Sequence, residues 1–373
     1  MLLTSCHKEE EIVPPSGHAV LMYFPWADNL YSCFLDNIED VKTAIAAGKG
    51  ATGTRVLVLL ATGSSKGQLS ELVYNDGKCE EHQLKTYTNW SFSNKENIKH
   101  MLNDMAAYAN AESYSMIIGS HGSGWLPKEC QPNKVRAFGG LTVNTKTNVE
   151  TLDSAIVESS IKHLDYLCFD DCYMANIETA YCLRDATDYL IASTSEIMDH
   201  GMPYGDIWSY MTSTAPDYQS IVDGFHSFYT SYRFPYGALS VTDCSQMEYA
   251  ATAMKELNVM MSEYGIVPTD ITPQRLDGIS YTVFFDMKDY TDKVLEALQE
   301  KGANTSSLAI NSLYDNVIIA HSCTPYLYSE YLSSFSGKTF SVATNCGITI
   351  SDPSRNSNAA SYIKNTEWYK ATR

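Results

Sequence analysis

Short apolar runs alternate with longer stretches of helical period along most of the chain. Runs of strand length occupy residues 19–24, 55–62, 68–74, 82–87, 114–119, 164–169 and 189–193. Between them, apolar positions recur every three or four residues over 35–47, 95–109, 150–163 and 174–184. Because this alternation is typical of sheets with helical crossovers, it predicts an α/β fold. The third and fourth runs flank Asn75-Asp76-Gly77, which predicts a β-hairpin, and Ser93 or Asn94 is the expected cap of the helix at 95–109.

The pattern changes after about Ser245, where helical stretches dominate and two short strands follow at 339–342 and 347–350. We therefore expect one domain at 18–245 and a smaller C-terminal α+β region at 246–373 that packs against it. Residues 1–17 are charged and then Pro-rich, a composition typical of a solvated tether.

The first residues indicate export. Leu3-Thr4-Ser5-Cys6 is similar to a bacterial lipobox, in which cleavage before the cysteine leaves a thiol that receives a lipid. A charged and apolar stretch normally precedes such a box, so we expect that the written chain begins inside a signal peptide. The alternative is an ordinary polar N-terminus with a chance match. The expected location is the cell envelope, through a lipid on Cys6, or the extracellular space.

Composition and charge disfavour several classes of protein. Lys and Arg total 26 against 44 Asp and Glu, and a formal charge of -18 would repel a phosphate backbone, so no nucleic-acid partner is expected. No run of 18 apolar residues occurs, so a membrane contact is expected only through the N-terminal lipid. The 10 cysteines include no pair at C-x-x-C spacing, which argues against a zinc ribbon or a thioredoxin-like site.

Two blocks place reactive side chains at the carboxyl ends of predicted buried strands, the edge where parallel sheets bind ligands. Ser120-His121-Gly122-Ser123-Gly124-Trp125 follows the strand at 114–119, and Asp170-Asp171-Cys172 follows the strand at 164–169. A cysteine at the N-terminus of the next helix would have a lowered pKa, and a histidine from the neighbouring strand would be the matching acid and base. Each residue alone is more often structural, but together they indicate a catalytic pair.

The two blocks resemble those of the clostripain-like cysteine peptidases, whose fold is related to that of caspases and gingipains. In that family a histidine precedes Gly-Ser-Gly-Trp, and the second block reads Phe-Asp-Ala-Cys-Leu-Met. Here Ser120 stands in place of the usual aspartate, and Asp171 and Tyr173 depart from the second block. Weaker similarities lie at 27–30, 192–204, 347–350 and 366–368. The resemblance implies a caspase-like α/β sandwich with a mostly parallel central sheet flanked by helices.

The resemblance also implies roles for individual residues. Cys172 would be the nucleophile, and His121 would protonate the leaving amine and later activate water. The backbone N–H groups of Gly122 and Cys172 would bind the oxyanion. Asp170 matches the family's carboxylate at the base of the pocket for the residue before the cut, so cleavage after Arg or Lys is expected. Asp199 is a second, weaker candidate for that pocket.

Asp170 and Asp171 point to opposite sides if their segment is extended. One should therefore face the pocket, and the other should be a helix cap or a solvated charge. The alternative is that both merely favour the N-terminus of the following helix.

Members of the family are often activated by self-cleavage between the two blocks. The loop at 126–143 is of this kind, and Lys134 or Arg136 is the expected cut site, although both could be ordinary surface charges. Some relatives require calcium, but no D-x-D-x-D-G loop occurs here, so we expect no metal and no other cofactor. The expected partners are peptide or protein substrates, and we expect a monomer.

Two rival functions come from other classes. The first is a surface lipoprotein without catalysis that binds extracellular peptides or glycans, a reading that the departures at Ser120 and Asp171 favour. The second is a glycosidase, but adjacent carboxylates in an extended segment diverge, whereas that chemistry needs two that face each other.

Overall fold

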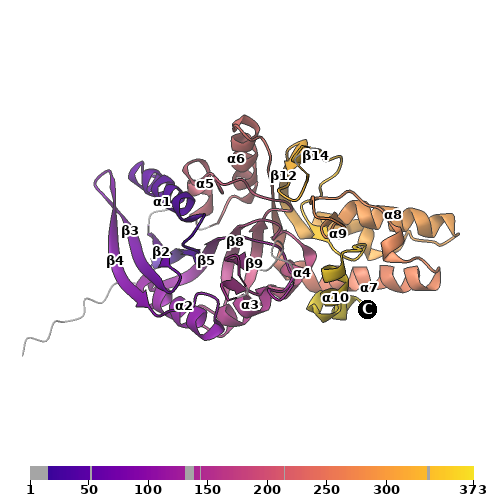
Figure 1. The fold of residues 1–373 in the computed structure, drawn as a ribbon, viewed down its shortest axis with the longest axis horizontal. Helices are drawn as coiled ribbons and strands as arrows, with labels where there is room; N and C mark the ends of the chain where they lie inside the picture. Colours follow the sequence, from indigo (N-terminus) through magenta and orange to yellow (C-terminus); the bar gives the residue numbers. More distant parts are fainter. Residues whose placement is uncertain (1–15, 51–52, 131–137, 143, 214, 334–336) are drawn as a thin grey trace, which may run out of the picture.

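The computed structural model describes residues 16–50, 53–130, 138–142, 144–213, 215–333 and 337–373. Within these residues, a nine-stranded sheet forms the centre of the molecule (Figure 1). In order across the sheet, its strands are β12 (Ile318–Cys323), β10 (Ala238–Asp243), β9 (Thr187–Ala192), β8 (Leu164–Asp170), β5 (Ala111–Gly119), β1 (Ser16–Phe24), β2 (Thr54–Gly63), β3 (Lys66–Asn75) and β4 (Lys78–Thr88). The inner strands from β9 to β2 run parallel, and antiparallel strands extend the sheet at both edges.

Helices cover both faces of the sheet, as the alternating pattern predicts. One face carries α1 (Tyr31–Ala46), α5 (Tyr204–Met211) and α6 (Tyr218–Ser231), and the other carries α2 (Lys95–Ala109), α3 (Val149–Val157), α4 (Ile177–Cys182) and α7 (Met247–Glu263) (Figure 1). The inner strand β1 is buried on both sides: Leu21 packs with the α2 face and Met22 with the α1 face. This double burial explains why the inner strands are continuous apolar runs rather than alternating ones. The fold is thus the predicted α/β sandwich.

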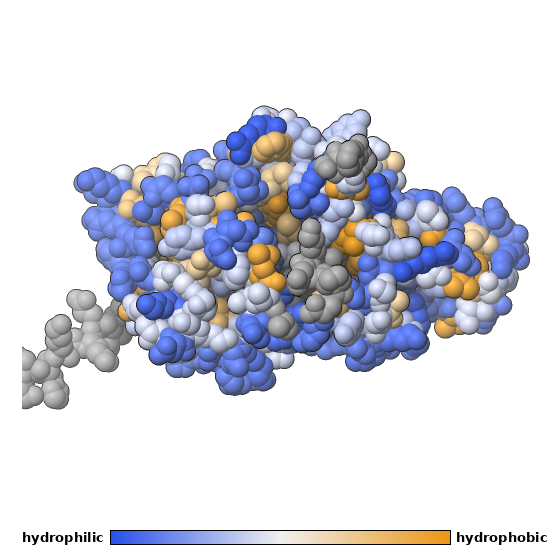
Figure 2. Space-filling model, in the orientation of Figure 1, coloured by the Kyte–Doolittle hydropathy of each residue, from blue (hydrophilic) through white to orange (hydrophobic). Residues whose placement is uncertain are grey.

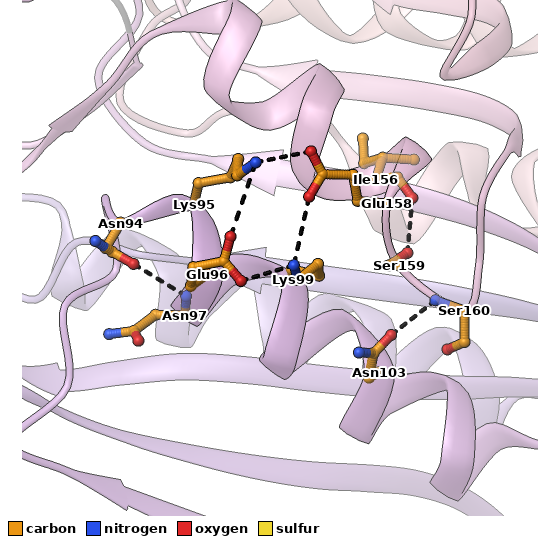
Figure 3. Close-up of polar contacts among 10 residues, drawn as sticks. All are labelled: Asn94, Lys95, Glu96, Asn97, Lys99, Asn103, Ile156, Glu158, Ser159 and Ser160. Atoms are coloured by element: carbon orange, nitrogen blue, oxygen red, sulfur yellow. Dashed lines mark hydrogen bonds and ion pairs between the residues drawn. The ribbon is translucent and has the colours of Figure 1, made fainter.

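Polar contacts fix the predicted helix α2 against α3 (Figure 3). Asn94 caps α2 by accepting from the backbone of Asn97. Lys95 and Lys99 both reach the carboxylate of Glu158, which follows α3.

Two predicted helices are shorter than expected, because polar side chains bind nearby backbone at their ends. The expected helix at 150–163 ends at Val157, where the hydroxyl of Ser159 donates to the carbonyl of Ile156. The expected helix at 174–184 begins only at Ile177, because Asn176 caps it through an oxygen that accepts from Thr179.

The region after residue 245 adds helices and short strands to one end of the sheet. They are α8 (Met287–Glu300), α9 (Leu313–Val317), α10 (Ser357–Tyr362), α11 (Glu367–Thr372), β11 (Phe285–Asp286), β13 (Tyr326–Tyr328), β14 (Thr339–Ser341) and β15 (Thr349–Ile350), with 3-10 turns at Cys244–Gln246, Pro268–Asp270, Ala309–Ser312 and Ile363–Asn365. Because β12 of this region pairs with β10, the central sheet continues across residue 245. The division into 18–245 and 246–373 stays a prediction.

The face in Figure 2 is mostly hydrophilic, with apolar residues gathered toward its middle. Among the helices of the described residues, none is both long and apolar enough to cross a membrane.

Candidate active site

A cavity of about 750 Å³ opens at the carboxyl ends of the parallel strands. Its lining includes five residues that the sequence singles out: His121, Gly122, Asp170, Cys172 and Asp199. The strand register explains why they meet, since Gly119 at the end of β5 pairs with Asp170 at the end of β8. The loops that carry the predicted histidine and the predicted nucleophile therefore start side by side.

Gly122 lies close to the segment Asp171-Cys172-Tyr173, the nucleophile loop, which carries the predicted nucleophile. No side chain would fit at Gly122. A Cβ atom added at Gly122 would lie 2.8 Å from the backbone nitrogen of Cys172 and 2.7 Å from the Cβ of Asp171. The two predicted oxyanion donors, the backbone N–H groups of Gly122 and Cys172, thus belong to segments in direct contact.

The thiol of Cys172 is half-buried, and its sulfur lies 3.4 Å from the backbone nitrogen of Ile197, which donates to it. Burial, followed by the negative charge of Glu196, raises the pKa of the thiol above its usual range. The expectation of a lowered pKa at a helix N-terminus is wrong for this structure. The helix α4 begins five residues later, at Ile177, and Tyr173 intervenes in a left-handed conformation with φ 63°.

His121 is held by both its backbone and its ring. Its backbone exchanges two hydrogen bonds, of 3.1 and 2.9 Å, with Gly139 of the short strand β6 (Phe138–Gly139), which pairs with β7 (Lys146–Thr147). Its Nε2 lies 3.1 Å from Oδ1 of Asn29. The indole of Trp26 donates to the same Asn29 atom at 2.9 Å, and an indole N–H only donates, so this atom is an oxygen.

These contacts fix the tautomer of the His121 ring. Since the Asn29 oxygen accepts, Nε2 carries the proton and Nδ1 is left as the acceptor. Burial, followed by the positive charge of Lys146, lowers the pKa of His121 from its usual value. The imidazole is thus neutral at pH 7 and able to take a proton.

Asp170 lies buried at the cavity, and one of its carboxylate oxygens lacks a hydrogen-bond partner among the described residues. Its Oδ2 accepts from the hydroxyl of Tyr204 at 2.9 Å, and the backbone of Met202 also hydrogen-bonds the carboxylate. Its Oδ1 is buried and has no hydrogen-bond partner among the described residues. Burial raises the pKa of Asp170 to about 6. A buried carboxylate with a vacant acceptor is suited to receive a cation.

Asp171 points away from Asp170, as expected for an extended segment, and binds Ser120. Its two oxygens accept from the backbone nitrogen of Ser120 and, at 2.9 Å, from the hydroxyl of Ser120. Asp171 is 1% exposed, so the expectation of a helix cap or a solvated charge is wrong. The alternative that both carboxylates favour the next helix is also wrong, because Asn176 caps α4.

Comparison with known families assigns the chain. The family model of the clostripain family, Peptidase_C11, matches residues 22–372. The chain belongs to the clostripain family. It is a cysteine peptidase with the caspase-like fold of the C11 proteases.

Solved structures agree with this assignment. The secreted C11 cysteine protease "iotapain" from Bacteroides thetaiotaomicron is 38% identical, with a TM-score of 0.86 over 97% of this chain and 100% of that one. A clostripain from the same species, in complex with the peptide inhibitor BTN-VLTK-AOMK, is 40% identical, with a TM-score of 0.55 over 63% of this chain and 98% of that one. An inactive zymogen C11 protease from Parabacteroides distasonis shares the fold at 23% identity and a TM-score of 0.81, covering 97% of this chain and 99% of that one. No curated protein matches.

In this clostripain-family protein, the second pocket candidate lies at the mouth of the cavity. The side chain of Asp199 is 60% exposed, and its Oδ2 is 4.0 Å from a guanidinium nitrogen of Arg233. Asp170 and Asp199 therefore differ in burial, and Asp170 is the better placed for a desolvated cation.

Sequence reasoning missed Glu196 as an organiser of the cavity wall. Its carboxylate accepts from the hydroxyl of Tyr173 at 2.6 Å, the hydroxyl of Ser329 at 2.7 Å and the backbone of Glu330 at 3.0 Å. It thus joins the nucleophile loop to the C-terminal region. The resemblance includes Glu196, Asn29 and Tyr204 in its weaker blocks, but their partners lie far along the chain, so spacing gives no signal of their roles.

Several predictions fall outside the described residues: the lipidation site Cys6 and the cut sites Lys134 and Arg136. The nine cysteines among the described residues are free thiols. Within the same residues, no group of three or more His, Cys, Asp or Glu side chains could hold a metal ion.

Proposed function

We propose that this protein is an endopeptidase that cleaves after Arg or Lys, with Cys172 as the nucleophile and His121 as the acid and base. The observation that carries the proposal is the buried oxygen of Asp170 that has no hydrogen-bond partner among the described residues, in the cavity that both residues line. A substrate guanidinium or ammonium would satisfy this oxygen and relieve the cost of an unpaired buried charge.

The pKa shifts indicate how the reaction starts. With the thiol pKa raised and the imidazole pKa lowered, the resting pair is a neutral thiol and a neutral imidazole. As Cys172 attacks the peptide carbonyl carbon, its proton passes to Nδ1 of His121. The resulting oxyanion lies beside the backbone N–H groups of Gly122 and Cys172.

The remaining steps return the enzyme to its starting state. His121 gives its proton to the leaving amine as the C–N bond breaks, which leaves a thioester on Cys172. The imidazole then takes a proton from water, whose oxygen attacks the thioester, and the released thiolate regains that proton. No metal is needed in this cycle.

Support for a basic preference comes from both charge and similarity. Asp170 supplies the carboxylate, and Asp199 adds a second negative group at the rim. The inhibitor in the 40% identical clostripain carries the sequence VLTK, which ends in lysine.

We further propose self-cleavage at Lys134 or Arg136 of the 126–143 loop, because both are residues that this pocket would accept. Export is also part of the proposal, since the 38% identical relative is described as secreted. A lipid on Cys6, the monomeric state and the absence of a metal stay predictions.

A peptide panel tests the proposal. Fluorogenic peptides ending in Arg, Lys, Asp or Leu are incubated with wild type, Cys172→Ala and the control Cys79→Ala, which removes another half-buried free thiol. We expect cleavage after Arg and Lys that is lost only in Cys172→Ala, with loss of any self-cleavage seen on a gel. No turnover by the folded, reduced wild type, with or without calcium, would instead favour a binding lipoprotein.

A further inference from the structure

Asp171 and Ser120 join the two loops that carry the proposed catalytic residues. Ser120 directly precedes His121, and Asp171 directly precedes Cys172. The carboxylate of Asp171 receives both the backbone N–H and the hydroxyl of Ser120, so two hydrogen bonds connect the loops one residue away from the chemistry.

The contact extends to a third segment. The backbone N–H of Gly139 lies 2.9 Å from the hydroxyl oxygen of Ser120 and also 2.9 Å from the carbonyl of His121. The hydroxyl of Ser120 thus accepts from Gly139 and donates to Asp171. Strand β6, the backbone of His121 and the nucleophile loop are held together through this one hydroxyl.

We propose that Asp171, acting through Ser120, is a positioning residue that fixes the imidazole of His121 relative to the thiol of Cys172. The inference rests on the proposed function of these two residues. These are also two of the positions at which the chain departs from the motifs it resembles, and the structure shows that they contact each other. The two departures therefore form one interaction and not two separate losses.

The geometry is favourable for such a role. Asp171 is fully buried, and the Cβ position of Gly122 lies 2.7 Å from the Asp171 side chain, so the loops have no room to shift toward each other. Removing the carboxylate would let them separate and would leave the backbone N–H of Ser120 without its acceptor. A misplacement of reacting groups by 1 Å can cost about 100-fold in rate.

The charge of Asp171 is not required by this mechanism. In Asp171→Asn, the amide oxygen still accepts from the backbone of Ser120, and the amide N–H₂ donates to the hydroxyl oxygen. The hydroxyl proton then turns to the carbonyl of His121, 3.2 Å away. The connection between the loops survives with its protons rearranged.

The test compares kcat, KM and melting temperature for five variants of the full chain. We expect Asp171→Ala to lose about 100-fold in kcat with KM changed less than about twofold, because Asp170 faces the other way. Ser120→Ala deletes a single oxygen, is the variant least at risk of misfolding, and should lose about tenfold. Asp171→Asn should keep kcat within about threefold of wild type.

The last two variants test an exchange of the two residues. Ser120→Asp alone places two carboxylates together and should be inactive. The double variant Ser120→Asp with Asp171→Ser restores one carboxylate and one hydroxyl, and its kcat should be at least about tenfold higher than that of Ser120→Asp alone. A control for lost hydrogen bonds is Asp217→Ala, since Asp217 binds the backbone and hydroxyl of Ser220 in the same way on the surface at the start of α6. This control should lower the melting temperature without changing kcat.

The outcomes separate the two proposals. If the wild type cleaves no peptide, the proposed function fails, but the rate of Cys172 alkylation by iodoacetamide across pH still reports how the imidazole assists the thiol. Folded Ser120→Ala and Asp171→Ala with wild-type kcat and alkylation profiles would overturn the positioning role. Equal losses in Asp171→Asn and Asp171→Ala would overturn it in favour of a charge effect.

Discussion

Replacing Asp170 by Asn tests the origin of the basic preference, because it removes one charge with almost no change in shape. In the wild type, Oδ2 accepts from Tyr204, and Oδ1 is buried without a hydrogen-bond partner among the described residues. The hydroxyl of Tyr204 and the backbone N–H of Met202 both donate to the carboxylate. In Asp170→Asn, the amide is therefore oriented with its oxygen toward these two donors. The amide N–H₂ is then left at the position of Oδ1, where it repels a substrate cation.

The structure gives the size of the effect. Leaving one member of a buried ion pair without its partner costs about 3–5 kcal/mol, and each 1.4 kcal/mol is tenfold, so kcat/KM for Arg peptides should fall about 100- to 4,000-fold. A peptide with citrulline, the neutral isostere of arginine, should lose less than about tenfold, because its urea oxygen accepts from the new amide.

The assay is the ratio of kcat/KM for matched Arg and citrulline peptides, measured across pH. Burial raises the pKa of Asp170 to about 6, so in wild type this ratio should fall as the carboxylate is protonated below about pH 6. Protonation of His121 affects both peptides and cancels in the ratio. In Asp170→Asn the ratio should be low and independent of pH. An Arg preference that survives the substitution would refute the role of Asp170.

Three further predictions concern other residues. Asn29→Ala should lower kcat about tenfold with little change in KM, because the ring of His121 loses the acceptor that fixes its tautomer; an unchanged kcat would show that the backbone alone orients it. Gly122→Ala should abolish activity, since its Cβ would lie 2.8 Å from the backbone nitrogen of Cys172, and a folded, active variant by circular dichroism and peptide cleavage would contradict this. Glu178 is buried, its Oε2 has no hydrogen-bond partner among the described residues, and burial raises its pKa to about 8. The stability that this group contributes is therefore fully present below the pKa of 4.5 that it has in the unfolded chain, and it is lost as pH rises toward 8. Glu178→Gln should therefore raise the melting temperature at pH 8 but not at pH 4.5, and an equal shift at both would contradict the argument.

The inner strands were predictable because burial on both faces leaves a local signal. A run such as 19–24 is apolar at every position, and the structure buries all of it. The edge of the sheet formed by β12 was not predicted. Its sequence, Ile318–Cys323, includes His321 and Ser322 and shows no clean period, and its place is set by pairing with β10, a contact distant in sequence.

The candidate site also combines residues that leave a local signal in the sequence with residues whose contacts are distant in the sequence. His121 and Cys172 could be singled out as candidates because each follows an apolar strand, and neighbouring parallel strands end at one edge. Asn29 and Glu196 act through partners far away in the chain, so only the folded structure brings those contacts together. The pKa of Cys172 was predicted in the wrong direction, because burial and then the charge of Glu196 raise it, and the helix expected to lower it begins only at Ile177.

The alternation of a strand explains how adjacent carboxylates take different roles here. Along the end of β8, Cys168 packs with the α1 face and Phe169 with the α2 face. Asp170 continues on the side of Cys168 and meets Tyr204 of α5, whereas Asp171 continues on the side of Phe169 and meets Ser120. Because the period of a strand is two, a shift of one residue in β8 would exchange the two environments. The end of β8 at Asp170 thus places the proposed pocket carboxylate, and the bend at Asp171 and the turn at Cys172 that follow place the contact with Ser120 and the thiol.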